Sequence, residues 1–299
     1  MEPFSHLIFW ENPIPTLCFF CFGMCFISLW IRKSVWLWGS FLLLAFIFAF
    51  QSHIAGWLSL IPVFILLFCH FFLNKPISKS ARFLLFGIAL LVSFALACKF
   101  LPGFNDWKVA PSLHLGESAH PYNLWLKFDK PFIGLFVLIF GLPLISSSSR
   151  LYEVLKVAIP MSIVGIFIMI GLSWYLDVVH WAPKIPIIAF VWMINQVLFV
   201  CIPEEAFFRG FIQKGLYDWW GKSSAAAFGS IVITSLFFAL LHLFWVEQLS
   251  FLFLVFIAGV IYGTIYQTTK AIESSILCHF ALNTTHFFLF TYPALETLK

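Results

Sequence analysis

Long runs of apolar residues, separated by short polar segments, make up most of the chain. A helix that crosses a lipid bilayer needs about 20 mostly apolar residues. Segments that approach this length cover 14–31, 34–50, 54–73, 83–99, 132–148, 157–176, 185–205, 224–244, 249–267 and 273–291. The pattern therefore predicts an all-α protein, a polytopic transmembrane helix bundle of about eight to ten spans.

A polar stretch at residues 100–131 interrupts this series. It contains Pro, Gly and charged residues, which end helices, and it separates four apolar segments from the six that follow. We therefore expect two regions. Residues 1–131 supply transmembrane helices and a polar loop to which the sequence assigns no role, and residues 132–299 form a second helical region.

The composition supports a membrane protein. Hydrophobic residues make up 62% of the 299 residues and charged residues 10%, whereas soluble domains average nearer one half and one quarter. The net charge of +4 is small, and no basic cluster is interleaved with aromatic residues. We therefore expect a lipid bilayer as the surroundings and no nucleic-acid partner.

The distribution of Lys and Arg predicts the orientation, because cytoplasmic loops carry an excess of these residues. With both ends of the chain outside, the inner loops hold 11 of the 17 Lys and Arg residues. We therefore expect an N-out, C-out topology, and we expect the membrane to be a bacterial inner membrane. The first apolar segment has no basic stretch before it and no small-residue cleavage motif after it, so we expect it to be retained.

The seven cysteines do not form a disulfide or zinc framework. Cys18, Cys21 and Cys25 share one face of the first predicted helix, and three thiols could hold a soft metal. No acid or histidine accompanies them in that segment. We therefore interpret them as packing residues.

Two adjacent acids lie between apolar runs in the stretch CIPEEAFFRG, residues 201–210. Ionisable groups at membrane depth are costly and are candidates for function. On an α-helix Glu205 and Arg209 lie four residues apart and can pair. Glu204 is rotated by about 100° from Glu205, so we predict that it is the freer acid and a candidate general base. The alternative is an ion-paired helix end at the cytoplasmic surface.

Further polar side chains lie on two later apolar segments. Phe238 and His242 are four residues apart in FFALLHLF, and His279 and Asn283 are four apart in CHFALNTTH. Each pair alone is compatible with helix packing. Together with Glu204 they bring one carboxylate, two imidazoles and one amide from three helices. This set can activate water and stabilise an oxyanion, and no Ser or Cys has the surroundings of a nucleophile.

These motifs resemble those of the CPBP family, the CAAX proteases and bacteriocin-processing enzymes, which are intramembrane endopeptidases. The three motifs occur in the family's order, within residues 185–291. They read Glu204-Glu205-x-x-x-Arg209, then Phe238-x-x-x-His242, then His279-x-x-x-Asn283.

The resemblance implies hydrolysis of a peptide bond within the bilayer, on a membrane-anchored peptide or protein substrate. It also implies roles for the matching positions. The implied catalytic residues are Glu204, which activates water, His242, which assists it, and His279 and Asn283, which stabilise the oxyanion. The implied supporting residues are Glu205 and Arg209 around the site and Phe238 in packing.

Metal dependence stays open at this point. Zinc could be held by Glu204, His242 and His279 with one open position. However, the chain has no H-E-x-x-H motif, and the amide of Asn283 completes a zinc site poorly. We therefore favour a metal-free mechanism without a cofactor.

One question follows from the predicted spans. His242 lies near the outer end of segment 224–244, whereas Glu204 lies near the inner end of segment 185–205. An offset of eight residues is about 12 Å, so either a helix begins later or a helix is broken. A site open to the cytoplasmic side would resolve the offset.

Two alternative functions stay open. One is a non-catalytic scaffold or bacteriocin-immunity protein. The other is a transporter, which is less favoured because inverted repeats are absent.

Overall fold

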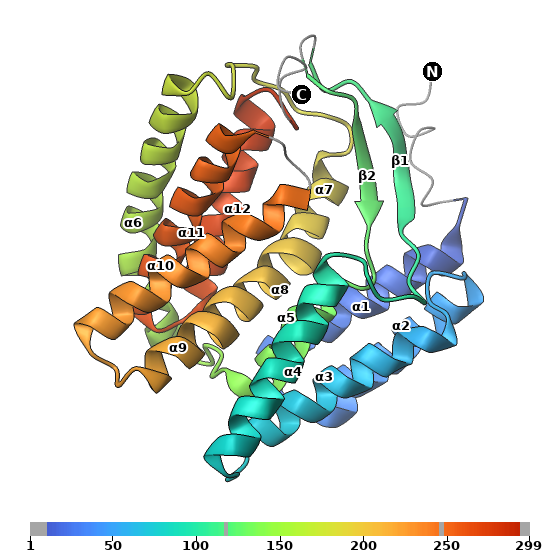
Figure 1. The fold of residues 1–299 in the computed structure, drawn as a ribbon. Coiled ribbons are helices and arrows are strands. Elements are labelled where there is room, and N and C mark those ends of the chain that lie inside the picture. Colours follow the sequence, from blue (N-terminus) through green and yellow to red (C-terminus); the bar gives the residue numbers. More distant parts are fainter. Residues whose placement is uncertain (1–10, 117–118, 245–247, 294–299) are drawn as a thin grey trace. The chain divides into compact units, whose positions relative to one another are not determined.

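The computed structural model describes residues 11–116, 119–244 and 248–293. Helices account for most of these residues, with one small two-stranded sheet (Figure 1). The predicted all-α polytopic fold is therefore confirmed. The helices are α1 (Pro13–Ile31), α2 (Val35–Gln51), α3 (Leu60–Leu73), α4 (Lys79–Ala97), α5 (Phe132–Phe136), α6 (Ser148–Tyr175), α7 (Ala189–Asn195), α8 (Ile202–Glu205), α9 (Lys214–Trp219), α10 (Ser224–Leu241), α11 (Leu249–Thr269) and α12 (Ile272–Leu289), and the strands are β1 (Trp107–Leu113) and β2 (Tyr122–Leu126).

Six helices within the described residues are long and apolar enough to cross a membrane. They are α1, α4, α6, α10, α11 and one continuous helix from Ala189 to Trp219. Shorter apolar helices cover Val35–Gln51, Trp57–Leu73 and Phe132–Gly141. The helical segments predicted from the apolar runs therefore exist, but fewer than the ten predicted segments reach spanning length.

One predicted span, residues 132–148, is wrong in its length. Its helix ends at Gly141, and residues 142–147 are irregular. Lys33 explains the early end, because its Nζ donates to the carbonyls of Leu138 and Leu142 at 2.5 Å each. The next helix, α6, begins earlier than predicted because the Ser147 hydroxyl accepts a hydrogen bond from the Arg150 amide and caps it.

The polar stretch 100–131 also contains more structure than predicted. It holds the β1–β2 hairpin, which the sequence analysis treated as loop. Strand β1 begins with an aromatic residue, Trp107, which stacks on Phe19 of α1 with ring centroids 5.9 Å apart. The hairpin is therefore anchored on the apolar surface of α1, which a pattern of local residues does not reveal.

The predicted span 185–205 continues without a break to Trp219. The helix has 31 residues, and Glu204 lies fifteen residues from each end of it. The prediction that Glu204 lies at the inner end of its helix is therefore wrong. Residues 196–201 and 206–213 of this helix are π-helical, a form in which each turn holds more residues than in an α-helix.

By its contacts, the chain divides into two compact units. The first unit consists of residues up to Ala110 together with Trp125–Leu144 and Leu198–Phe207. The second consists of Pro111–Leu124, Ile145–Val197 and the residues from Phe208 onward. The boundary between the two units therefore falls twice within the long helix Ala189–Trp219.

Aromatic rings form the core of the first unit. The ring of Phe22 in α1 lies 4.8 Å from that of Phe128, 5.0 Å from that of Phe132 and 5.8 Å from that of Phe199. The ring of Phe46 in α2 adds an edge-to-face contact with Phe128 at 5.2 Å. These contacts fix the segment that enters α5 against α1 and against the long helix.

Small residues let the helices of the second unit pack closely. Gly259 and Gly263 in α11 form a G-x-x-x-G pattern, which permits close approach of helices in membranes. A Cβ at Gly259 would lie 3.0 Å from the Cβ of Ser235 in α10, and one at Gly263 would lie 2.8 Å from Gln213 Oε1. Helices α10 and α11 therefore approach each other closely at these glycines of α11.

In the first unit, Gly134 of α5 lies directly against Pro203, the residue before Glu204. A Cβ at Gly134 would overlap the backbone of Pro203. We expect Gly134→Ala to lower the free energy of unfolding by about 1–3 kcal/mol, because backbone atoms must shift. Thermal unfolding of the purified protein in detergent measures this change.

Gly87→Ala is the matched control. Gly87 also lies in a helix, α4, but a Cβ there meets no atom within 4 Å. Since Ala favours helix over Gly by up to about 1 kcal/mol, this variant should be as stable as the original protein or more so. Equal stability of the two variants would contradict the close approach of α5 and α8.

Candidate functional site

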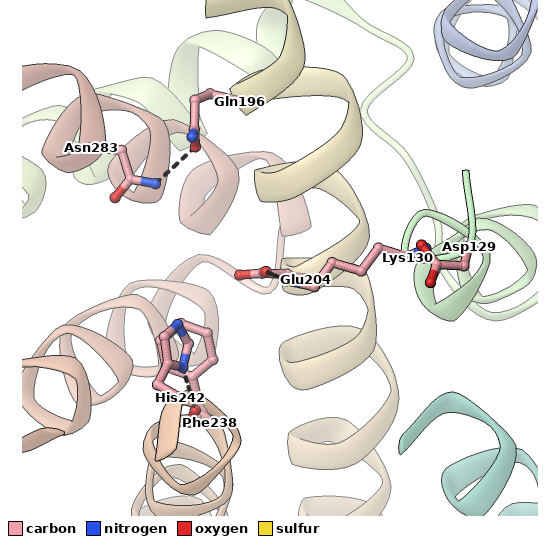
Figure 2. A network of polar contacts seen from close by, with 7 residues as sticks. All are labelled: Asp129, Lys130, Gln196, Glu204, Phe238, His242 and Asn283. Carbon is pink, nitrogen blue, oxygen red and sulfur yellow. Dashed lines mark hydrogen bonds and ion pairs between the residues drawn. The ribbon is translucent and has the colours of Figure 1, made fainter. Parts of the chain in front are cut away.

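Glu204 has an ion-pair partner that the sequence analysis missed. The Nζ of Lys130 lies 3.2 Å from Glu204 Oε1, and both residues belong to the first unit (Figure 2). Glu204 is buried, with 7% of its surface exposed. Glu204 was predicted as the freer acid of the two with respect to Arg209, and the ion pair with Lys130 was not predicted. Because the two residues are 74 positions apart, no local sequence pattern predicts their contact.

Local contacts hold Lys130 in place. Its backbone amide donates to Asp129 Oδ1 at 2.8 Å, and the neighbouring Phe128 and Phe132 belong to the aromatic core. Burial raises the pKa of the Asp129 carboxyl above its ordinary value. Burial, together with the charges of Lys130 and Lys99, lowers the pKa of Lys127 to about 8. The segment that carries Lys130 is therefore a partly buried group of charges.

The α-helical spacing assumed for Glu204, Glu205 and Arg209 holds only in part. Helix α8 is α-helical over Ile202–Glu205, so the rotation of about 100° between Glu204 and Glu205 applies. Residues Ala206–Gln213 are π-helical, so α-helical spacing does not apply between Glu205 and Arg209. Glu205 and Arg209 are fully buried, and their predicted pairing stays a prediction.

His242 lies directly after the last residue of α10, and its tautomer follows from one contact. Its Nδ1 lies 2.8 Å from the carbonyl oxygen of Phe238 (Figure 2). A carbonyl only accepts hydrogen bonds, so Nδ1 carries the proton and donates it. In the neutral ring Nε2 is then the acceptor nitrogen, which is the atom able to take a proton or bind a metal.

His279 is held by aromatic rings in the second unit. Its ring stacks on Tyr262 of α11, with centroids 4.7 Å apart and planes 18° apart. The ring of Phe238 contacts it edge-on at 6.2 Å and contacts His242 at 4.8 Å. One phenyl ring therefore lies against both imidazoles, which come from different helices.

The guanidinium of Arg209 contacts the ring faces of this aromatic group. Its guanidinium carbon lies 4.9 Å from the ring centroid of Phe238 and 5.2 Å from that of Tyr262. Its Nη2 donates to the carbonyl of Gly259 at 3.0 Å. Four residues further on, Gln213 Nε2 donates to the carbonyl of Gly263 at 2.9 Å. Two polar side chains of the long helix thus bind two glycine carbonyls of α11.

Asn283 is oriented by Gln196, a residue that the sequence analysis did not single out. Asn283 Nδ2 donates to Gln196 Oε1 at 3.1 Å (Figure 2), and Gln196 is buried, with 8% exposure. This hydrogen bond fixes which side of the amide carries the N–H donors. The adjacent polar pair Asn195-Gln196 within an apolar segment is a sequence signal that could have identified it.

The structure thus brings His242, His279 and Phe238 together in the second unit, which also holds Asn283. Glu204 and Glu205 belong to the first unit. Within residues 11–116, 119–244 and 248–293, no three His, Cys, Asp or Glu side chains are grouped as metal ligands. The seven cysteines are free thiols.

One comparison with known proteins gives a match. Residues 186–285 match the family model of the type II CAAX prenyl endopeptidases, described as Rce1-like. This family is the one that the three motifs resemble, so the predicted family is confirmed for that region. No curated protein and no solved structure matches the chain. Lys130 lies outside the matched region, whereas Gln196 lies inside it.

The contacts of Arg209 predict that lysine cannot replace it. Arg209→Lys keeps the charge but loses the planar group that stacks on Phe238 and Tyr262. We expect it to lower the free energy of unfolding by about 2 kcal/mol, because a desolvated cation–π contact contributes roughly that much. Thermal or denaturant unfolding in detergent measures the loss.

Lys214→Met provides the control on the same helix. Lys214 pairs with Asp218 at 2.9 Å and is half-exposed, and such a pair contributes only about 0.3–0.5 kcal/mol. This variant should unfold almost as the original protein does. If Arg209→Lys were equally stable, the aromatic support of the site would not depend on a guanidinium.

Proposed function

We propose that this multi-pass membrane protein is an intramembrane endopeptidase that hydrolyses a peptide bond near a membrane anchor, in CAAX-type processing or a related reaction. The observation that carries the proposal is the match of residues 186–285 to the CAAX prenyl endopeptidase family. The matched region contains all the residues proposed from the motifs, and six helices are long and apolar enough to span a bilayer.

In the proposed mechanism Glu204 acts as the general base. Its carboxylate takes a proton from a water molecule, and the water oxygen forms a bond to the carbonyl carbon of the scissile peptide. The carbonyl oxygen becomes an oxyanion, which accepts hydrogen bonds from His279 and Asn283. Glu204 then returns the proton to the peptide nitrogen as the C–N bond breaks, which leaves one new acid and one new amine.

The contacts of His242 and Asn283 support these roles. With Nδ1–H donated to the Phe238 carbonyl, His242 offers Nε2 as an acceptor to the attacking water and helps to orient it. With one Nδ2–H donated to Gln196, Asn283 retains its second N–H for the oxyanion, since an amide nitrogen carries two donors. The mechanism requires Glu204 and these side chains to act on one substrate.

We further propose that the reaction uses no metal. The residues that zinc would require are Glu204, His242 and His279, with water in the fourth position. The chain has no H-E-x-x-H motif, and the fourth polar residue of the set, Asn283, carries an amide. With Glu204 as the base, His242 orienting the water, and His279 and Asn283 donating to the oxyanion, all four side chains have a role without a metal.

The surroundings remain those expected from the sequence. We propose a bacterial inner membrane, an N-out, C-out orientation and a site open to the cytoplasmic side, the arrangement that the Lys and Arg content of the loops predicted from the sequence favours. The substrate class is a membrane-anchored peptide or protein.

Substitution of the proposed catalytic residues tests the function. In proteoliposomes with a prenylated peptide that ends in a CAAX sequence, we expect Glu204→Gln, His242→Ala and His279→Ala each to lower kcat about 100-fold or more. Asn283→Ala should also lower kcat about 100-fold, as loss of an oxyanion donor does. Mass spectrometry of the released tripeptide measures the rates.

Two exposed residues provide matched controls. Glu153→Gln makes the same chemical change on α6, where Glu153 pairs with Arg150, and His180→Ala removes a histidine that pairs with Asp177. Both should retain full activity. Full activity of Glu204→Gln, His242→Ala and His279→Ala would exclude the proposed endopeptidase mechanism and favour a non-catalytic scaffold or immunity protein.

Metal removal tests the second part of the proposal. We expect dialysis against EDTA or 1,10-phenanthroline to leave kcat unchanged, and elemental analysis of active protein to find less than about 0.1 zinc per chain, well below the one ion that a catalytic site holds. Loss of activity on chelation that returns with added zinc would replace the metal-free mechanism with a zinc-dependent one.

A further inference from the structure

The geometry assigns a new role to Lys130: we propose that it is a positioning residue that holds the Glu204 carboxylate correctly oriented for general-base catalysis. This inference rests on the proposed function of Glu204. It extends the site beyond residues 186–285, which the family model matches, because Lys130 lies in the segment between the β1–β2 hairpin and α5.

The first step is the contact itself. Lys130 Nζ lies 3.2 Å from Glu204 Oε1, and 24% of the Lys130 side chain and 10% of the Glu204 side chain are exposed. An ammonium at this distance favours the charged form of a carboxylate, and in partly desolvated surroundings the attraction is much stronger than in water. The attraction therefore holds the carboxylate of Glu204 against the Lys130 ammonium.

The second step is orientation. Because Oε1 of Glu204 accepts from Lys130, the contact constrains the direction in which the carboxylate points. The other end of the contact is fixed as well. Phe128 and Phe132, on either side of Lys130, pack on Phe22 of α1, and the Lys130 amide donates to Asp129. The backbone that carries the Lys130 side chain is therefore fixed by packing and by a hydrogen bond.

The third step is the charge of the surrounding group. Lys99 pairs with Asp106. The charges of four neighbouring residues act on the Lys127 ammonium: Lys130, Lys99, Asp106 and Asp129. With Glu204 included, three lysines and three carboxylates are present in this part of the first unit. Loss of the Lys130 charge would remove the ammonium that lies 3.2 Å from Glu204. The N-terminal region thereby acquires a role in the reaction.

The first experiment separates positioning from general stability. Lys130→Met removes the charge and keeps a long side chain, and Lys130→Arg keeps the charge. On the prenylated CAAX peptide in proteoliposomes, we expect Lys130→Met to lower kcat about tenfold or more while KM changes less than about threefold, since the residue acts on the base and does not bind substrate. Lys130→Arg should recover at least a third of the original kcat.

Lys108→Met is the matched control. Lys108 lies on β1 of the neighbouring hairpin, over the ring of Trp125 at 5.5 Å, and its loss should leave kcat unchanged. The inference is overturned if folded Lys130→Met retains the original kcat. It is also overturned if Lys130→Arg is as slow as Lys130→Met while both unfold at the same temperature as the original protein.

A second experiment does not depend on activity. Unfolding in detergent is measured for Lys130→Met, Glu204→Gln and the double variant. If the residues pair, the double variant should lose less stability than the sum of the single losses. Additive losses would refute the pair.

The two proposals fail in different ways. An inactive Glu204→Gln beside a fully active Lys130→Met refutes only the role of Lys130. A fully active Glu204→Gln refutes the proposed function, and with it the role of Lys130 in catalysis, whatever coupling the unfolding experiment finds.

Discussion

A buried guanidinium determines the arrangement of the second unit. Placing a charge among membrane helices is costly, so the protein surrounds Arg209 with its own atoms. It does so with the carbonyl of Gly259 and with the faces of Phe238 and Tyr262. The same two rings lie against His242 and His279. The cost of burying one charge is therefore offset by contacts that also fix both imidazoles.

Three of the candidate groups share a second property: each has a polar contact with another residue of the chain. The carbonyl of Phe238 fixes the tautomer of His242, Gln196 orients the amide of Asn283, and Lys130 binds Glu204. A reacting group that is already oriented needs little reorganisation when charge develops. In a bilayer, where little water is present to compete, such partners have a stronger effect than at a protein surface.

The sequence predicted what depends on neighbours along the chain. The apolar runs predicted the all-α membrane fold, and three spaced motifs predicted the family to which residues 186–285 match. The predictions from the sequence were wrong or incomplete where contacts between residues far apart in the chain determine the structure. The helix was predicted to end near residue 205, but Arg209 and Gln213 find acceptors on α11, so the helix continues through its polar residues to Trp219. Lys130 could not be predicted as the partner of Glu204, because the pair forms through the folding of α5 against α8.

The π-helical stretches of the long helix have a consequence for how this site can change in evolution. A π-helical turn arises when an α-helix accommodates one additional residue, and such turns are common at functional sites. One stretch, residues 196–201, precedes Glu204, and the other, residues 206–213, contains Arg209. Because the wider turn absorbs the additional residue, deletion of a single residue from either stretch would restore regular α-helix and leave the residues beyond it in nearly the same angular position about the axis. The number of residues between Gln196, Glu204 and Arg209 can thus change by single-residue insertions and deletions while the rest of the helix keeps its orientation.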